Sequence, residues 1–325
     1  MTAFRTITAG AVALACLAAA PAAALDKVRI TNAQEGFWDQ NFIEWGAEAG
    51  IFEKHGIDLE VIWTDGGANA QQAVISGSVD MSFGTGVLGV ISAWAQGAPV
   101  EITAATMTGA SDLFWYARAD SGITSMADTQ GRTVAYSRPG SSTNLIAAKL
   151  VEIAGTDAEL VGIGGPAASL TAVMSGQIDV GWSSAPFGYD RIAAGELVRI
   201  ATGNDVPGVA EQVVRVQIAN RNFLQNNPDV VRRYFEAFRE TLEWAYAEDE
   251  ALQKWAEIHG LDLETARQIR DEIYPREAVA PYPITGIEAN VRDAVETGRL
   301  DAMLSPEDME RMLAVAAELH GAEAR

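Results

Sequence analysis

AVISGSVDMSF at residues 73–83 recurs in altered form as AVMSGQIDVGW at residues 172–182. Each copy combines the end of a helical segment, a Ser-Gly pair and an apolar run that carries one Asp. Glycine suits the left-handed backbone conformation that ends many helices. The apolar run after it is typical of a buried strand. The repeat therefore predicts two α/β lobes built on the same plan.

Strand and helix patterns alternate around both copies. In the first lobe we expect strands at residues 27–31, 59–63, 79–83 and 100–106, with helices at 42–54, 68–76 and 88–95. In the second lobe we expect strands at 133–136, 158–163, 178–183 and 197–201, with helices at 143–154 and 167–175. This alternation indicates parallel sheets that carry helices on both faces.

Two apolar segments, residues 113–117 and 213–219, flank the second lobe and are predicted to be hinge strands that cross between the lobes. After them the pattern is helical, with Pro228 at a helix start and an apolar stripe that follows it. We expect these C-terminal helices to pack on the first lobe. Lobe 1 would then comprise residues 25–112 and 220–325, and lobe 2 would comprise 113–219 with both hinge strands.

Residues 1–24 have the features of a secretory signal peptide. Arg5 precedes an apolar run at 7–20, and three alanines at 22–24 offer a cleavage site. We therefore expect a periplasmic protein that is cleaved near Ala24. Cys16, the only cysteine, leaves lipid anchoring open as a less favoured alternative, because the three residues before it fit a lipoprotein signal poorly. The cleaved chain has no cysteine, which excludes disulfides and thiolate metal sites.

The charge balance is strongly acidic, with 44 Asp and Glu against 23 Lys and Arg and a net charge of −21. Nucleic acid and anionic membrane surfaces are poor partners for such a chain. Beyond the signal, no apolar run reaches the roughly 20 residues of a membrane-spanning helix. The sequence has no G-x-S-x-G, H-E-x-x-H or P-loop motif. We therefore predict a monomeric binding protein without enzymatic activity, metal or cofactor.

The segment WGAEAGIFEKHGIDLEVIW, residues 45–63, resembles ABC-transporter substrate-binding proteins of the nitrate/taurine/sulfonate type, the NMT1/THI5-like family. That family also carries the AVxSGxxD phrase, and residues 125–132 and 182–187 resemble its entry to lobe 2 and the corner after its second repeat. Ala185 departs from the acid that is usual at this corner. The resemblance implies a type II periplasmic binding fold, solute delivery to a membrane permease and no catalysis. Related thiamine-pyrimidine synthases need a cysteine-rich motif that the cleaved chain lacks.

Ligands of open α/β sheets bind beyond the carboxyl ends of the strands. Four strand ends therefore supply the candidate ligand-binding residues. The first and third strands contribute Glu35, Phe37, Trp38, Gly84, Thr85 and Gly86. The second lobe contributes Tyr136, Arg138, Ser141, Ser142, Thr143, Trp182 and Ser183.

The types of these residues suggest the ligand class. Hydroxyls and free backbone N–H groups at a helix start bind carboxylate, sulfonate or phosphate oxygens, and aromatic rings pack against an apolar or ring-shaped body. We expect a small organic solute with an anionic or oxygen-rich end and an apolar or aromatic part, and sulfonate, carboxylate and pyrimidine-like compounds all stay open. The structural alternatives are an N-cap role for Ser141 or Ser142, turn roles for the glycines and core packing for the tryptophans.

Two other functions stay open from the sequence. GTGVLG at 84–89 fits the dinucleotide-binding pattern G-x-G-x-x-G, which would suit a secreted oxidoreductase. It follows the third strand instead of the first, and Thr106 and Thr108 stand where an acid for the ribose is expected. The second alternative is a sensor subunit, in which the same clamp reports to a membrane receptor instead of feeding a permease.

Overall fold

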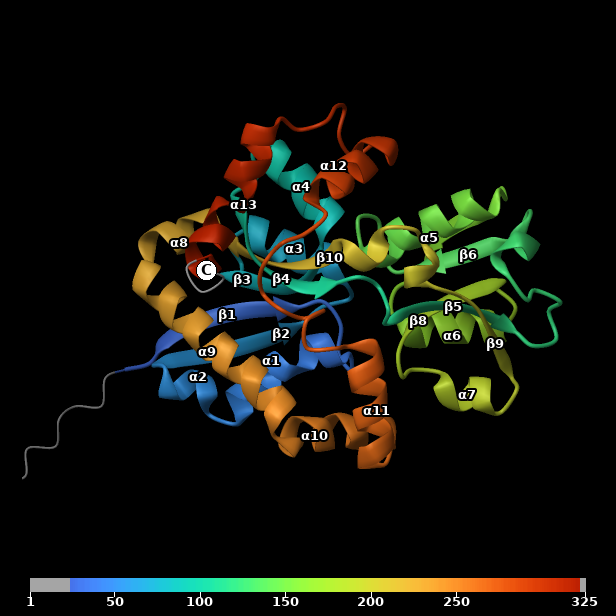
Figure 1. Ribbon diagram of the computed structural model, residues 1–325, viewed down its shortest axis with the longest axis horizontal. Coiled ribbons are helices and arrows are strands. Elements are labelled where there is room, and N and C mark those ends of the chain that lie inside the picture. Colours follow the sequence, from blue (N-terminus) through green and yellow to red (C-terminus); the bar gives the residue numbers. More distant parts are fainter. Residues whose placement is uncertain (1–23, 322–325) are drawn as a thin grey trace, which may run out of the picture.

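The computed structural model of this protein describes residues 24–321. Two five-stranded sheets form two lobes, drawn at the left and right of Figure 1. The first sheet has the strand order β2-β1-β3-β10-β4, and the second has the order β7-β6-β8-β5-β9. The predicted signal peptide and Cys16 lie outside the described residues, apart from Ala24. No helix within residues 24–321 is both long and apolar enough to cross a membrane.

The first lobe alternates strands and helices as predicted. Its strands are β1 Asp26–Asn32, β2 Ile57–Trp63, β3 Met81–Gly86 and β4 Val100–Thr108, and its helices are α1 Trp38–Glu48, α2 Ile51–Lys54, α3 Gly67–Ile75 and α4 Val87–Ala95. The single helix predicted at 42–54 is two helices, because the chain turns through Gly50 with a φ of 76°. β3 extends to Gly86, beyond the predicted end at 83, because β10 pairs with its last residues.

The second lobe repeats the plan. Its strands are β5 Leu113–Arg118, β6 Thr133–Tyr136, β7 Glu159–Gly162, β8 Val180–Ser184 and β9 Leu197–Thr202. Its helices are α5 Ser142–Ala154, α6 Pro166–Met174 and the short α7 Tyr189–Ala193, with 3-10 turns at Met126–Thr129, Gly203–Asp205 and Val209–Glu211. Gly77 and Gly176 end the two repeat helices with φ values of 74° and 76°. The sequence repeat is therefore a structural repeat.

The two strands expected at the hinge each lie within a sheet. β10, Val213–Asn220, pairs antiparallel with β3 and β4 of the first sheet, so the placement of residues 213–219 in lobe 2 is corrected. All eight of its residues are buried, because it lies inside that sheet between β3 and β4. β5 holds the matching position between β8 and β9. The chain crosses between the sheets in residues 109–112 and 203–212.

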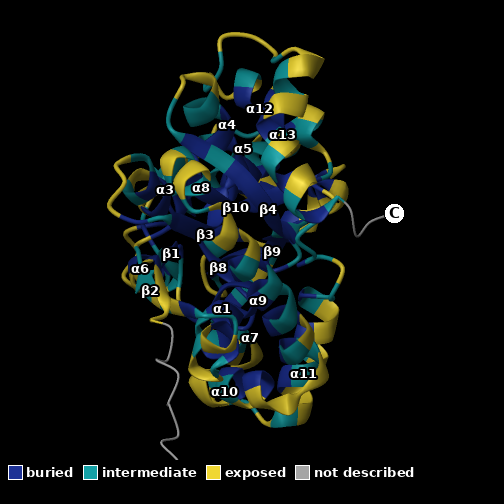
Figure 2. Ribbon diagram, turned by 90° about the vertical axis from the view of Figure 1, so that its left-hand side faces the viewer, coloured by how far each residue is buried: buried dark blue, intermediate teal, exposed yellow. Residues whose placement is uncertain are grey.

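The C-terminal helices are α8 Arg221–Asn226, α9 Pro228–Ala247, α10 Asp249–His259, α11 Leu263–Ile273, α12 Ile287–Glu296 and α13 Pro306–His320. α9 packs on α1 and α2, α12 packs on α4, and α13 packs on β4, which agrees with the predicted packing on lobe 1. The predicted stripe on α9 is buried; it comprises Val231, Tyr234, Phe238, Leu242 and Ala245. Figure 2 shows the buried residues concentrated in the central strands between these helices.

Candidate functional site: a pocket between the lobes

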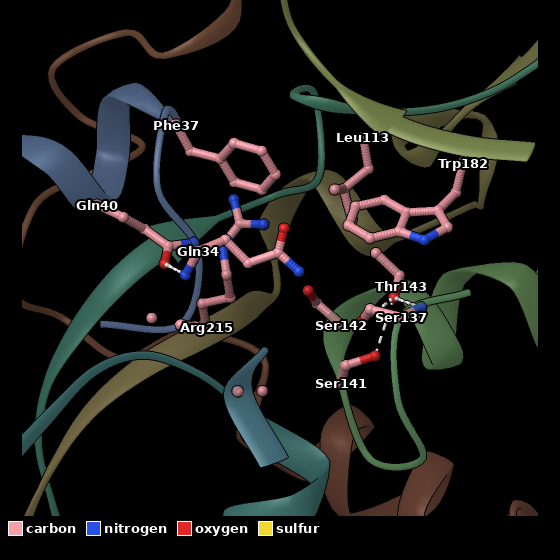
Figure 3. A pocket seen from close by; sticks show the side chains of 14 residues that line it. Gln34, Phe37, Gln40, Leu113, Ser137, Ser141, Ser142, Thr143, Trp182 and Arg215 are labelled. Atoms are coloured by element: carbon pink, nitrogen blue, oxygen red, sulfur yellow. Dashed lines mark hydrogen bonds between the residues drawn. The ribbon is translucent and has the colours of Figure 1, made fainter. Parts of the chain in front are cut away.

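A pocket with an empty volume of about 310 Å³ lies between the two sheets. The first lobe lines it with Ala33, Gln34, Phe37, Gln40, Gly67, Gly84, Gly86 and Arg215. The second lobe lines it with Leu113, Ser137, Ser141, Ser142, Thr143 and Trp182. Figure 3 shows the side chains of both groups pointing toward one another across this space. A molecule held here would contact both lobes at once.

One wall of the pocket is the loop from β6 into α5. The hydroxyl of Thr143 accepts the Ser137 N–H at 2.9 Å and lies 2.8 and 2.9 Å from the hydroxyls of Ser137 and Ser141. Ser141 is also the N-cap of α5, since its hydroxyl accepts the Asn144 N–H at 3.2 Å. Figure 3 shows the Ser142 hydroxyl directed into the pocket. The first N–H groups of a helix have no intrahelical acceptor, so this wall presents several hydrogen-bond donors.

The opposite wall combines an aromatic ring with amide groups. Phe37 lies just before α1, edge-on to the Phe187 ring of the second lobe, with 6.0 Å between the ring centroids. Gln40 in the first turn of α1 accepts the Gln34 N–H at 2.8 Å, which fixes its amide. Gly84 has a φ of 74°, and a Cβ there would lie 2.8 Å from the Gln40 amide. Only glycine therefore allows this amide to lie against β3.

Trp182 supplies a second aromatic surface at the end of the repeat. Its indole N–H donates to the carbonyl oxygen of Gly164 at 3.0 Å, which fixes the ring plane beside the serine loop. Leu113 lies next to it in Figure 3. The pocket therefore has an apolar side facing a side rich in hydroxyls and amides.

A buried charge cluster lies behind the pocket. Arg215, near the start of β10, has its Nε 3.2 Å from Asp39 and its Nη2 2.9 Å from Asp112. Asp39 and Asp112 are fully buried and Arg215 is 3% exposed. Burial raises the pKa of Asp39 to about 7; the Arg215 charge opposes this shift and the Asp112 charge adds to it. Burial disfavours the charge of Arg215, but the two carboxylates outweigh it and raise the pKa of the guanidinium.

The structure brings several predicted residues to this pocket and places others elsewhere. The lining includes Phe37, Gly84, Gly86, Ser141, Ser142, Thr143 and Trp182. Trp38 is fully buried and donates its indole N–H to Tyr246 at 2.9 Å, because α1 turns it toward the C-terminal helices. Thr85 is also fully buried, since alternation along β3 points it away from the face of Gly84 and Gly86.

The remaining predicted residues lie around the pocket. Ser183 donates its hydroxyl to the carbonyl oxygen of Phe187 at 3.0 Å. Glu35 lines an outer hollow next to the pocket, and Gln34 lines both spaces. Arg138 packs beside Gly66 of the first lobe, and the half-buried Tyr136 lies against Gly162. For these residues ligand contact stays a prediction.

Sequence reasoning missed Gln40, Leu113 and Arg215 as lining residues, and it placed Gln34 and Ser137 in cleft-facing loops without singling them out. Arg215 had a readable signal, because a single Arg interrupts the apolar run 213–216. A charge inside a buried strand needs a buried partner of opposite sign. Gln34 and Gln40 had no such signal, because polar residues after a strand are common in loops.

Among the G-x-G-x-x-G glycines, Gly86 serves the contact between the lobes, whereas Gly89 makes room for a side chain of its own lobe. A Cβ on Gly86 would lie 2.6 Å from the carbonyl oxygen of Gly140, and a Cβ on Gly89 would lie 2.7 Å from the Gln71 amide. Protein backbone of the second lobe therefore occupies the start of α4, where a dinucleotide pyrophosphate would have to bind. Within residues 24–321, no group of three or more His, Cys, Asp or Glu side chains is placed to hold a metal ion.

A family model described as NMT1/THI5 like matches residues 42–251. Among solved structures, the chain is similar to the alkanesulfonate-binding protein SsuA from Xanthomonas axonopodis pv. citri bound to MOPS, with 16% identity and a TM-score of 0.69 over 91% of this chain and 96% of that one. It is also similar to the periplasmic aliphatic sulphonate binding protein SsuA from Escherichia coli, with 18% identity and a TM-score of 0.64 over 86% and 90% of the two chains.

The periplasmic nitrate-binding protein NrtA from Synechocystis PCC 6803 is a further structural relative, with 14% identity and a TM-score of 0.69 over 92% of this chain and 90% of that one. No curated protein sequence matches the chain significantly. The structural relatives share the periplasmic binding protein fold, so the predicted two-lobed type II architecture is confirmed.

Proposed function

This chain belongs to the NMT1/THI5-like family, and from that premise we propose that it is a periplasmic solute-binding protein of an ABC importer. Its role is to bind a small organic anion between its lobes and present it to the membrane permease. The observation that carries this proposal is the pocket lined by the α5 start of one lobe and by Phe37, Gln40 and Arg215 of the other. Binding, not catalysis, is the function that these residues serve.

The serine loop suits the anionic end of the solute. The N-terminus of a 13-residue helix carries a partial positive charge, and its free N–H groups point at whatever lies in front of it. Ser141, Ser142 and Thr143 add hydroxyls at the same place. A sulfonate or carboxylate group has the several acceptor oxygens that such a cluster of donors requires. Two of the structural relatives have names that describe sulfonate binding, which supports the sulfonate class.

The apolar side of the pocket suits the remainder of the molecule. Phe37, Leu113 and Trp182 offer ring and methyl surfaces that favour an alkyl or aromatic body. Little space is left between these side chains in this arrangement of the lobes, since the empty volume of about 310 Å³ includes open solvent. The expected solute is therefore a compact sulfonate or carboxylate with a short alkyl chain or a single ring.

Transfer to a permease requires a closed form that differs from the open one. Both lobes line the pocket, so ligand contacts are complete only when the lobes meet, and residues 109–112 and 203–212 are the segments that must bend. Closure gives the two lobes one fixed spacing, which a permease can recognise. The acidic surface and the predicted signal peptide, cleaved near Ala24, agree with a protein that works outside the cytoplasm.

Residues 25–325 should be purified and screened by thermal shift against sulfonates, carboxylates, amines, pyrimidines and nitrate. A ligand at 100 times its Kd adds about 2.7 kcal/mol to the free energy of unfolding. We expect stabilisation by a sulfonate or carboxylate, followed by a measurable Kd in calorimetry. Uptake of the same labelled compound should be lost in cells that lack the protein. Stabilisation by amines alone would contradict the anionic class, and unchanged uptake would contradict delivery to an importer.

A further inference from the structure

The charge cluster behind the pocket holds more negative than positive groups. Asp39 comes from the first turn of α1, Asp112 from the crossing segment and Arg215 from β10, and all three are buried. Arg215 also lines the pocket, where Figure 3 shows its guanidinium between Phe37 and Gln34. The one buried cation that an incoming anion meets is thus already shared between two carboxylates.

Other ionisable groups around Asp39 do not offset this excess of negative charge. The groups that face it are Arg215, Asp112, Tyr274 and Tyr246. Burial raises the pKa of both tyrosines, so they stay neutral. The Arg270 guanidinium lies over the rings of Trp38 and Tyr246, and its Nη2 is 2.6 Å from Asp271. The charge state of this cluster therefore depends on the two aspartates that contact Arg215.

An anion placed against Arg215 would add a further negative charge to this buried site. Three negative groups would then share one guanidinium away from water, and buried groups avoid such a cost by changing their protonation state. The charged form of Asp112 is stabilised by a hydrogen bond, because its carboxylate accepts the Ser184 hydroxyl at 2.9 Å. Neither oxygen of Asp39 has a well-aligned hydrogen-bond donor among the described residues. Asp39 is therefore the group that takes up a proton most readily.

We propose that an anionic solute enters this pocket together with one proton, which Asp39 accepts from the solvent. The inference rests on the proposed function, because it requires an anionic solute. Burial, with the added repulsion from Asp112, raises the pKa of Asp39 to about 7, so its carboxylate is ready to take up a proton near neutral pH. Binding would then weaken as the pH rises above neutrality, so that the solute is held more tightly in mildly acidic surroundings.

A first experiment needs no ligand. If the folded state holds a proton on Asp39 up to about pH 7 and the unfolded chain releases it near pH 3.8, the folded state binds more protons between these values. Stability that comes from this proton is present at low pH and is lost as the pH rises toward 7. Asp39→Asn, which is neutral at all pH values, lacks this loss. The exposed Asp58→Asn on β2 is the matched control and should follow the unmodified protein.

A second experiment measures proton uptake on binding. Butanesulfonate and benzenesulfonate are titrated by calorimetry at pH 7.5 in phosphate and in Tris, buffers that differ in their heats of ionisation. We expect uptake of a substantial fraction of one proton by the unmodified protein and by Asp58→Asn, and none by Asp39→Asn. Between pH 7.5 and 8.5 the Kd of the unmodified protein should rise by up to about tenfold, while that of Asp39→Asn stays constant.

The outcomes separate this inference from the proposed function. A constant difference in stability between Asp39→Asn and the unmodified protein from pH 5 to 8 would overturn the inference without any ligand. Sulfonate binding with a pH-independent Kd and no proton uptake would overturn the inference and leave the proposed function standing. Failure of both sulfonates to bind at any pH from 5 to 8 would overturn the sulfonate class of the proposed function and, with it, this inference.

Discussion

The side chains of Lys149 on α5 and Asp293 on α12 form an ion pair between the lobes, with 2.6 Å between Nζ and Oδ1. Asp293 is nearly fully buried, and its second oxygen has no hydrogen-bond partner among the described residues. Close by, the Arg299 guanidinium donates to Asn144 at 2.7 Å, also from one lobe to the other. This arrangement of the two lobes is therefore supported by polar contacts outside the pocket.

Replacing Lys149→Ala should weaken ligand binding by about tenfold. The closed form would hold a buried carboxylate without its cation, whereas opening of the lobes lets water reach Asp293. Calorimetry with the ligand found in the screen measures the change. Arg292→Ala, on the same helix but in an exposed pair with Glu288, is the matched control and should leave Kd unchanged. Equal Kd values for the two variants would show that the pair does not support closure.

Gly86→Ala should block closure and leave each lobe folded. Gly86 has a φ of −62°, which alanine adopts freely, but its Cβ would lie 2.6 Å from the Gly140 carbonyl oxygen of the other lobe. We expect at least a hundredfold loss of affinity and less than about 1 kcal/mol of change in the free energy of unfolding. This small change reflects an unstrained backbone.

Gly165→Ala is the control for that variant. Gly165 precedes α6 as Gly86 precedes α4, its φ is −74°, and its nearest neighbour would be the Gln34 amide at an ordinary 3.7 Å. Its Kd should change by less than threefold. Ligand affinity that survives in Gly86→Ala would mean that the lobes do not approach at this point when the solute is bound.

The double substitution Ser141→Ala with Ser142→Ala should weaken binding of an anionic ligand at least tenfold. It removes two hydroxyls from the wall that faces the anion. Ser141 is also a helix cap, so the free energy of unfolding should fall by about 1 kcal/mol. Ser305→Ala removes the equivalent cap of α13, far from the pocket, and should lower stability without a change in Kd. Unchanged affinity in the double variant would show that the anion does not bind at this helix start.

Arg215→Leu should be strongly destabilising, by about 3–5 kcal/mol at pH 8, because it leaves two buried carboxylates without their cation. The loss should shrink toward pH 5, since Asp39, whose pKa burial raises to about 7, is then protonated and neutral. Combining Arg215→Leu with Asp39→Asn and Asp112→Asn should recover much of the stability. Urea unfolding at both pH values measures these differences. A pH-independent loss would show that Arg215 matters for packing and not for charge.

The repeat and the strand–helix alternation were enough to predict most elements, because both are local patterns. The strand at 133–136 is found with its predicted ends, and Gly77 and Gly176 stop their helices as expected. The position of β10 was not predictable in this way. An apolar strand after the second lobe fits either sheet, and only the open position between β3 and β4 decides the matter.

The candidate site likewise combines residues that local patterns reveal with residues that only distant parts of the chain place. Ser141 and Ser142 belong to a local helix start, and the sequence identifies it. Trp38 was expected in the cleft, but its packing partners Tyr246 and Trp255 lie more than 200 residues further along the chain, where no local pattern reveals them. The cluster of Arg215 with its two aspartates has the same origin, because each member comes from a different segment.

The place of β10 in the first sheet also sets the order in which the two lobes fold as the chain emerges with its N-terminus first. Residues 113–202 contain every strand of the second sheet, so that lobe can complete its hydrogen-bonded core early. The first sheet lacks the strand between β3 and β4 until residue 220 has emerged, and until then β3 and β4 each present an unpaired edge. Lobe 1, which begins the chain, is thus the last to complete its sheet. Until then the unpaired edges of β3 and β4 are where a holding chaperone would be needed most.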